Sequence, residues 1–235
     1  MPMQQRTTAL WRVAVAMALA AWAAPAQAQV PPSAAEITQF GALHAAAHRG
    51  DLGALRAALA AGAAINGRDR YGRTALHVAT FARQREVMRA LVKAGADLAL
   101  LENDRYDAVT IAAVADDEPT LALLLELGAS AKLVTSRYDG TALIAAAHLG
   151  HDGAVRALIE NGAPLDHVNS LKWTALIEAV VLGDGGPRHQ ATLKALIDAG
   201  ANLALTDRAG KTPLELARGR GFDAMVRMLE APPRR

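Results

Sequence analysis

The sequence predicts an all-α fold, a solenoid of about six helix-turn-helix units joined by hairpin or loop fingers. Two observations carry this prediction: a short phrase such as TALHVAT recurs along the chain, and a glycine follows the second helical segment of most units. The phrase begins near residues 41, 74, 107, 141, 174 and 212, so the steps are 33, 33, 34, 33 and 38 residues. Because one unit cannot bury its apolar face alone, stacked units are expected to share one continuous core.

Ahead of the first repeat, residues 1–28 have the pattern of an export signal. The start carries Arg6 and Arg12 without an acidic residue, an apolar run covers residues 13–24, and small residues alternate up to Ala28. This order is typical of a cleavable Sec-type signal peptide, and the run is shorter than the roughly 20 residues that span a bilayer. We therefore expect cleavage after Ala28 and a periplasmic or secreted protein. A core helix is the alternative, but the run shows no amphipathic pattern.

The charge balance argues against nucleic acid as a partner. The whole chain has 25 basic and 23 acidic residues, and removal of residues 1–28 would leave 23 of each. A neutral exported chain has no strong electrostatic attraction to DNA or RNA. The absence of cysteine excludes disulfides, thiolate catalysis and cysteine metal sites, so the fold depends on packing alone.

Each unit is expected to contain two helices of different character. In the first unit, ALHAAAHRG forms a short helix of mostly small residues, which lets a neighbouring helix approach closely. The second helix carries Leu52, Leu55, Ala58 and Leu59 at helical spacing and ends at a glycine suited to a left-handed cap. The predicted organisation is a signal peptide over residues 1–28, a lead-in over 29–40, the repeat domain over 41–231 and a tail over 232–235.

The recurring phrases resemble those of the ankyrin repeat family. The resemblance rests on TALH at Thr74, D-R-Y-G-R-T at Asp69, TPLELA at Thr212 and the recurring G-A-x-[LI], and it extends from Gly41 to about Glu230. It implies an elongated stack of helix pairs with fingers projecting from one side, most similar to exported ankyrin proteins of Gram-negative bacteria. It also implies protein binding through the fingers and the inner helices, and it implies no enzymatic activity.

Repeat three departs from the pattern at both of its helices. It opens with Asp107 where threonine is expected. Pro119 is expected in the first turn of its second helix, where a missing N–H is tolerated, with Asp116 or Asp117 as the cap.

Repeat five contains five extra residues, Asp184–Arg188, between its two helices. We expect them to lengthen the turn, with Pro187 starting the second helix and with Asp184 and Arg188 able to pair. An exposed pair contributes only about 0–1 kcal/mol to stability, so an interaction role is the favoured hypothesis for the insertion.

Catalysis is not indicated by any motif. His44 and His48 have the spacing of a helical metal pair, but the resemblance assigns His44 and His77 to hydrogen bonds between neighbouring loops. No serine lies in a G-x-S-x-G motif, and the glycine-rich insertion lacks the preceding strand and following Lys-Ser/Thr of a phosphate-binding loop. We predict that the protein is not an enzyme and has no catalytic residue, metal or cofactor. A hydrolytic or metal site in the concave groove is the alternative.

The predicted function is a non-catalytic scaffold that binds a partner protein of unknown identity, as a monomer without nucleic acid or lasting membrane contact. A secreted effector that binds a host protein is the alternative. Tyr71, Tyr106, Tyr138 and Trp173 each lie within three residues before a repeat start, where such rings either carry interface energy or pack between fingers. The predicted partner-binding residues are Arg70, Tyr71, Arg73, Phe81, Arg105, Tyr106, Arg137, Tyr138, Asp139, His148, Leu149, Lys172, Trp173, Glu178, Asp184 and Arg188.

Overall fold

The structure is a computed structural model, and it describes residues 30–231. The chain divides into two units at Pro31, and the second contains every repeat. The predicted signal peptide (residues 1–28) and tail (residues 232–235) lie outside the described residues.

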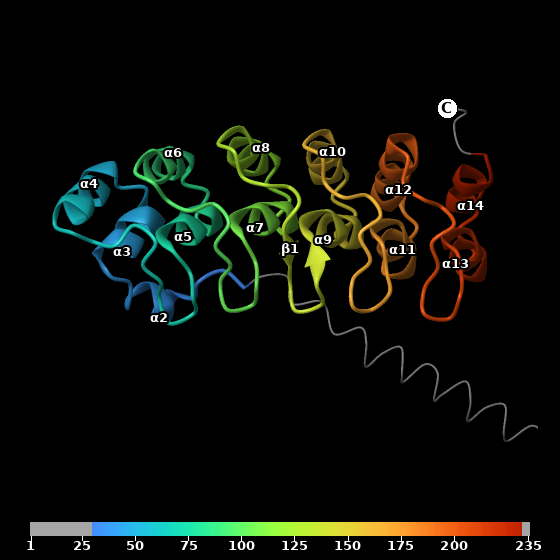
Figure 1. The fold of residues 1–235 in the computed structure, drawn as a ribbon, viewed down its shortest axis with the longest axis horizontal. Coiled ribbons are helices and arrows are strands. Elements are labelled where there is room, and N and C mark those ends of the chain that lie inside the picture. Colours follow the sequence, from blue (N-terminus) through green and yellow to red (C-terminus); the bar gives the residue numbers. More distant parts are fainter. Residues whose placement is uncertain (1–29, 232–235) are drawn as a thin grey trace, which may run out of the picture. The chain divides into compact units, whose positions relative to one another are not determined.

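Within the second unit the helices stack in two rows beside a row of fingers (Figure 1). A short lead-in helix, α2 (Ala34–Ile37), comes first. The inner row, next to the fingers, contains α3 (Ala42–Arg49), α5 (Ala75–Phe81), α7 (Ala108–Val114), α9 (Ala142–Leu149), α11 (Ala175–Val181) and α13 (Pro213–Gly219). The outer row contains α4 (Leu52–Ala60), α6 (Arg85–Lys93), α8 (Glu118–Glu126), α10 (Asp152–Glu160), α12 (Pro187–Ala199) and α14 (Asp223–Glu230). Each inner helix packs on the next inner helix and on its own outer helix, which confirms the predicted all-α solenoid.

The repeat phrase begins with a helix cap. In repeats two, four, five and six the threonine at the phrase start accepts a hydrogen bond from a backbone N–H in the first turn. In repeat three Asp107 accepts the same bond from Thr110 at 2.8 Å, so the departure in sequence keeps the cap. Asp117 caps α8 with Pro119 in its first turn, as predicted, whereas Asp116 adopts a left-handed conformation with φ 53°.

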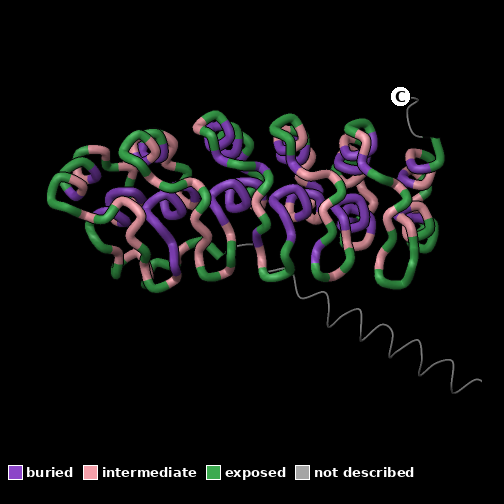
Figure 2. The backbone as a smooth tube through the Cα atoms, viewed as in Figure 1, coloured by how far each residue is buried: buried purple, intermediate pink, exposed green. Residues whose placement is uncertain are grey.

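The core lies between the two helical rows. Leu55, Leu91, Leu124, Leu158 and Leu196, one from each of five outer helices, are fully buried. They pack on inner helices whose small alanine side chains are also buried, and the buried residues form one cluster along the stack (Figure 2). Each repeat therefore contacts mainly its neighbours, and the stability of the array is expected to be a sum of local terms.

A finger connects each outer helix to the next inner helix, and we number it by the repeat that it precedes. Fingers two to six have a common turn, in which an oxygen of the first side chain accepts hydrogen bonds from the backbone N–H groups two and four residues later. The turns comprise residues 69–73, 102–106, 136–140, 169–173 and 207–211, with Asp69, Glu102, Ser136, Asn169 and Asp207 as acceptors. In finger four the turn closes a short antiparallel pair, β1 (Val134–Thr135) and β2 (Gly140–Thr141), in register Val134 with Thr141.

The insertion in repeat five forms helix as well as loop. Helix α12 begins at Pro187, with Gly186 as its cap, and has 13 residues, whereas α4, α6, α8 and α10 have nine. The predicted helix start is confirmed. The expectation that the insertion lengthens the turn holds for residues 184–186 and is wrong for Arg188, which lies in the helix that Pro187 starts, because proline is well suited to a first helical turn.

The two charged ends of the insertion do not pair with each other, contrary to expectation. Asp184 accepts a hydrogen bond from Gly186 N at 2.8 Å and lies 2.8 Å from His189 Nδ1. Arg188 instead reaches Asp116 of repeat three at 2.9 Å and Asp152 of repeat four at 3.4 Å. The hydrogen bond from Arg188 lowers the pKa of Asp116 below its ordinary value. The insertion therefore links three consecutive repeats.

Candidate protein-binding surface

The fourth residue of each finger turn has a left-handed backbone. In fingers two and six this residue is glycine, Gly72 (φ 74°) and Gly210 (φ 75°), as expected for a conformation that disfavours a Cβ atom. In the three central fingers it is Arg105 (φ 66°), Asp139 (φ 53°) and Lys172 (φ 65°). All three of these side chains are exposed. The central fingers therefore keep charged side chains at positions where the backbone favours glycine.

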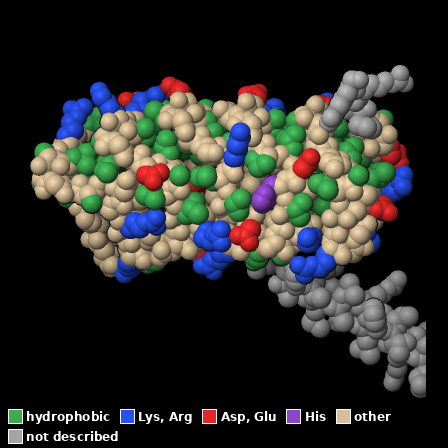
Figure 3. All heavy atoms as spheres, viewed as in Figure 1, with side chains coloured by type: hydrophobic (Ala, Val, Ile, Leu, Met, Phe, Trp, Pro, Cys, Tyr) green, Lys and Arg blue, Asp and Glu red, His purple; other side chains and the backbone are tan. Residues whose placement is uncertain are grey.

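Neighbouring central fingers are joined by backbone and side-chain contacts. Ser136 N donates to the Arg105 carbonyl at 2.9 Å, and Ser170 N donates to the Tyr138 carbonyl at 2.9 Å. Arg105 also pairs with Asp139 at 3.2 Å. A second ion pair joins Arg137 of finger four to Asp104 of finger three. Basic side chains gather along the finger edge of the face in Figure 3, with acidic side chains beside them. Fingers three to five thus form one continuous charged surface, which we call the finger ladder.

The four aromatic residues before the repeat starts are not equally accessible. The side chain of Tyr138 is 56% exposed and projects from finger four. Tyr106 and Trp173 are half-buried beside it on fingers three and five. Tyr71 is half-buried, with the guanidinium of Arg70 4.7 Å from its ring centroid. Tyr138 is therefore the ring most available to a partner, whereas the others contribute partly to packing.

Two predicted binding residues are buried, and the expectation that they are exposed is wrong. Arg73 is 5% exposed, because it pairs with Asp69 in its own finger at 2.8 Å and with Glu36 of α2 at 3.0 Å. Glu178 is 4% exposed in the middle of α11. Burial alone would raise the pKa of Glu36, but hydrogen bonds from Tyr71 and Arg73 lower it below its ordinary value.

Glu178 belongs to a polar cluster between repeats four and five. Asn169 Nδ2 donates to Glu178 Oε1 at 2.9 Å, and His148 Nδ1 lies 3.3 Å from Oε2. The His148 contact is close enough for an ion pair, but its geometry does not make a hydrogen bond to Oε2. Sequence reasoning did not select Asn169. The signal was present, because Asn169 occupies the acceptor position of Asp69 and Asp207.

Two further predicted residues lie at the C-terminal ends of inner helices. Phe81 and Leu149 are half-buried at the ends of α5 and α9. Leu182, which the sequence analysis did not select, follows α11 and is 39% exposed. Asp184 and Arg188 lie at the far end of α11 from finger five, so the structure does not bring the insertion together with the finger ladder.

The histidines of the repeat phrases make structural hydrogen bonds. His44 Nε2 lies 2.9 Å from the Arg73 carbonyl, and His77 Nε2 lies 3.2 Å from the Tyr106 carbonyl, so each ring ties an inner helix to the next finger. His151 and His189 likewise contact the carbonyls of Ala113 and His148. Within residues 30–231 no group of three or more His, Asp or Glu side chains is arranged to hold a metal ion. None of the helices in this range is long and apolar enough to cross a membrane.

Comparisons with known proteins agree with this architecture. A family model for ankyrin repeats, in three copies, matches residues 25–102 and 109–207. The ankyrin repeat protein YahD of Escherichia coli (strain K12) is 37% identical over 187 residues, which are 79% of this chain and 92% of YahD.

Solved structures give the same result. A crystallised ankyrin repeat domain from Acinetobacter baumannii AYE is 40% identical, with a TM-score of 0.75 over 80% of this chain and 95% of that domain. The ankyrin repeat domain of Bcl-3, a member of the IkappaB protein family, is 28% identical, with a TM-score of 0.72 over 81% and 85% of the two chains. The complex of the Bdellovibrio bacteriovorus endopeptidase Bd0816 with the immunity protein Bd3460 contains a chain that is 22% identical. Its TM-score of 0.68, over 81% and 97% of the two chains, is a likeness of fold alone.

Proposed function

Because this chain belongs to the ankyrin repeat family, whose repeats are protein–protein interaction modules, we propose that it is a non-catalytic scaffold whose partner binds fingers three to five. The partner contacts five residues of the finger ladder, which are Arg105, Arg137, Tyr138, Asp139 and Lys172. Arginine and tyrosine are enriched among the residues that carry interface energy, and each of these side chains is exposed.

The observation that carries this proposal is the left-handed backbone at Arg105, Asp139 and Lys172. A left-handed conformation costs a residue with a Cβ atom roughly 1–2 kcal/mol, and glycine at the same position avoids most of that cost. The glycines at the equivalent positions of fingers two and six show that the turn itself needs no side chain there. A binding role explains why charged side chains occupy these three positions in the central fingers.

We also propose that the protein acts in the periplasm after export. The support is the basic start, the short apolar run and the A-x-A sequence that ends at Ala28. Sequencing the N-terminus of the protein isolated from a Gram-negative host should find Gln29 or a residue close to it. A full-length product in the cytosol would contradict this location without affecting the binding proposal. Recovery from the culture medium would favour a secreted effector.

Affinity measurements on finger variants test the binding surface. The wild-type chain first captures its partner from a periplasmic extract, and the purified partner is then titrated. Replacing Tyr138 and Trp173 together by alanine should weaken binding by about 2 kcal/mol or more, roughly 30-fold, if fingers four and five contact the partner. Leu182→Ala is the control, because it removes an exposed apolar side chain outside the predicted binding residues, at the far end of α11 from finger five, and it should leave the affinity nearly unchanged. If the double variant melts much earlier while its folded fraction binds normally, the rings are spacers and the proposal is wrong.

A further inference from the structure

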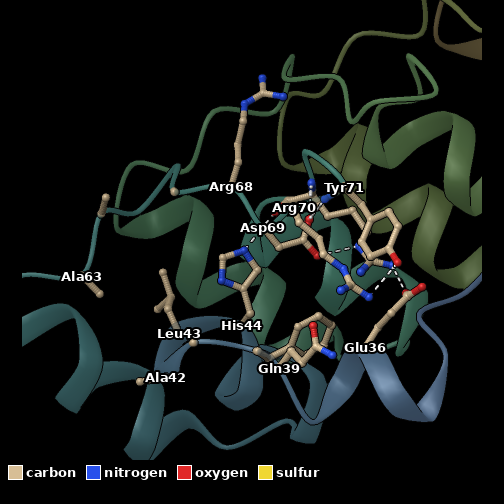
Figure 4. A pocket seen from close by; sticks show the side chains of 15 residues that line it. Glu36, Gln39, Ala42, Leu43, His44, Ala63, Arg68, Asp69, Arg70 and Tyr71 are labelled. Carbon is tan, nitrogen blue, oxygen red and sulfur yellow. Dashed lines mark hydrogen bonds and ion pairs between the residues drawn. The ribbon is translucent and has the colours of Figure 1, made fainter.

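A cavity of about 530 Å³ lies at the first-repeat end of the stack, away from the central fingers. Its floor is formed by Glu36 of α2, the link after that helix and the start of α3, and its opposite wall is finger two with the segment that leads into it. In Figure 4 the side chains of Glu36 in α2 and His44 in α3 extend from the helices toward Tyr71 and Asp69 of the finger. The volume is within the range of roughly 300–1,000 Å³ that is usual for small-molecule sites.

Arg73 lines this cavity, and one of its donors is unused. Its side chain is 6% exposed. Nε donates to Asp69 at 2.8 Å and Nη1 donates to Glu36 at 3.0 Å. The third nitrogen, Nη2, is buried and has no hydrogen-bond partner within the part of the chain that the structure describes. A buried charged donor without a hydrogen-bond partner has a high free-energy cost. A bound ligand that supplies an acceptor to Nη2 would remove this cost.

The surroundings of Arg73 favour an anion with an apolar body. The Tyr71 ring centroid lies 4.5 Å from the Arg73 guanidinium carbon, and the Phe40 ring centroid lies 5.7 Å from it. The charged lining residues are three arginines, at positions 68, 70 and 73, and two carboxylates, Glu36 and Asp69, which leaves one net positive charge. A monovalent anion would balance this charge, and the two rings would cover an apolar group attached to it.

We propose that this cavity binds a carboxylate carried on a small apolar body, with Arg73 Nη2 as the buried donor. A guanidinium suits a carboxylate because its N–H groups lie in one plane and stay charged at any physiological pH. Arg73 is held in place by Asp69 and Glu36, so the donor is positioned before the ligand arrives. The Tyr71 ring centroid lies 4.5 Å from the guanidinium carbon and Nη2 is buried, so the ring has to move for a ligand to reach that atom. This site is separate from fingers three to five and does not depend on the proposed partner.

The test is a titration of the purified chain, followed by NMR of the arginine side-chain nitrogens. N-acetylphenylalanine supplies a carboxylate on an apolar peptide-like body, and its neutral amide is the matched control. Benzoate supplies the same charge without a peptide unit. We expect both acids to shift the Arg73 signals, and we expect the amide to bind at least tenfold more weakly than N-acetylphenylalanine.

The two acids also distinguish the source of the ligand. A clear preference for N-acetylphenylalanine assigns the site to the carboxylate end of a peptide, and similar binding of both assigns it to small organic acids. The proposal is overturned if neither acid shifts the Arg73 signals, or if the amide binds as well as the acid. The first result would mean that the site binds no carboxylate, and the second would mean that it recognises the apolar body and not the charge.

A variant that fills the cavity gives an independent test. Gly41 lines the cavity, and a Cβ atom built on it meets nothing within 4 Å, so Gly41→Leu can place a side chain at the cavity without a clash at Cβ. Gly219→Leu is the control, because a Cβ atom there also meets nothing within 4 Å, and Gly219 ends α13 in repeat six. N-acetylphenylalanine should bind Gly41→Leu at least tenfold more weakly than it binds the control, with melting checked for both. Equal binding by a folded Gly41→Leu variant would contradict the proposed location.

Discussion

Fingers two and six form the same hydrogen-bonded turn as the three central fingers but differ from them at its left-handed fourth position. The outer pair has glycine at the left-handed position, whereas the central three have Arg105, Asp139 and Lys172 there. The helices beneath all five fingers pack in the same two rows and share one buried cluster. The difference therefore concerns the exposed turn and not the support beneath it. Stability and surface chemistry are therefore separable along this solenoid, and the following experiments test that separation.

The largest effect is expected from a charge placed in the common helical support. Leu176 is 1% exposed in α11, so Leu176→Asp should bury an unpaired carboxylate and lower the free energy of unfolding by about 3–5 kcal/mol. Because contacts are mainly between neighbours, repeats five and six should lose hydrogen-exchange protection before repeats one and two. Leu43→Asp, at the equivalent position of repeat one, should reverse that order. Uniform loss along the chain in both variants would rule out a stack of local units.

Acid should weaken the link between the helical support and finger three. Burial lowers the pKa of His77 to about 4 from an ordinary value of 6.5. The unfolded chain therefore binds a proton more readily than the folded chain between these values. The stability that depends on neutral His77 is complete above pH 6.5 and is lost as the pH falls to about 4, by up to about 3 kcal/mol. Urea titrations across this range should show the fall, and His77→Gln should reduce its slope. Equal slopes for the two proteins would mean that His77 does not titrate as described.

Deletion of residues 184–188 tests whether the insertion belongs to the support or to the surface. The deletion restores a 33-residue step and removes the contacts of Arg188 with Asp116 and Asp152. It also removes Gly185, against which the Phe222 ring packs closely. We expect the deletion to lower the free energy of unfolding, measured by thermal unfolding, by only about 1–2 kcal/mol. Exposed ion pairs contribute little to stability, and shorter loops are tolerated. Arg188→Ala alone should lose less than about 1 kcal/mol. Failure of the deletion variant to fold would show that the extra helical turn is essential to the stack.

A reciprocal exchange at the finger turns should give the smallest change, with opposite signs. Lys172→Gly relieves a left-handed backbone and should raise the free energy of unfolding by about 1 kcal/mol. Gly210→Lys should lower it by a similar amount, and a Cβ atom there meets nothing within 4 Å, so the loss would come from the backbone alone. Denaturant curves measured side by side can resolve the difference. If Lys172→Gly is destabilising, the lysine side chain supports the fold and the comparison of fingers fails.

Most of the fold could be predicted from the sequence, because most repeats contain a residue that caps the first helix and a glycine that follows the second. The cap at Asp117 and the helix start at Pro187 followed from local rules of the same kind. The burial of Arg73 could not be predicted in this way, since its partner Glu36 lies 37 residues away in a lead-in helix outside the repeat. The burial of Glu178 also depends on residues outside its own helix, because its carboxylate contacts Asn169 of finger five and His148 of the preceding repeat.

The left-handed position of the central fingers could also have been predicted from the sequence. Aligning the finger turns places Arg105, Asp139 and Lys172 beneath Gly72 and Gly210, which marks a position that favours a positive φ. The selection of all three as binding residues rested on charge and location instead. In the structure each of these residues holds a side chain where the backbone disfavours one.

The most direct test of the separation between stability and binding replaces Arg105, Asp139 and Lys172 by glycine in one chain. The free energy of unfolding and the affinity for the captured partner are then measured on the same preparation. Our account predicts that the variant is at least as stable as the wild type, because the relief of backbone strain offsets the exposed Arg105–Asp139 pair. It also predicts that the variant binds the partner at least tenfold more weakly. A stable variant that binds with unchanged affinity would contradict the account, because the central fingers would then have no binding role.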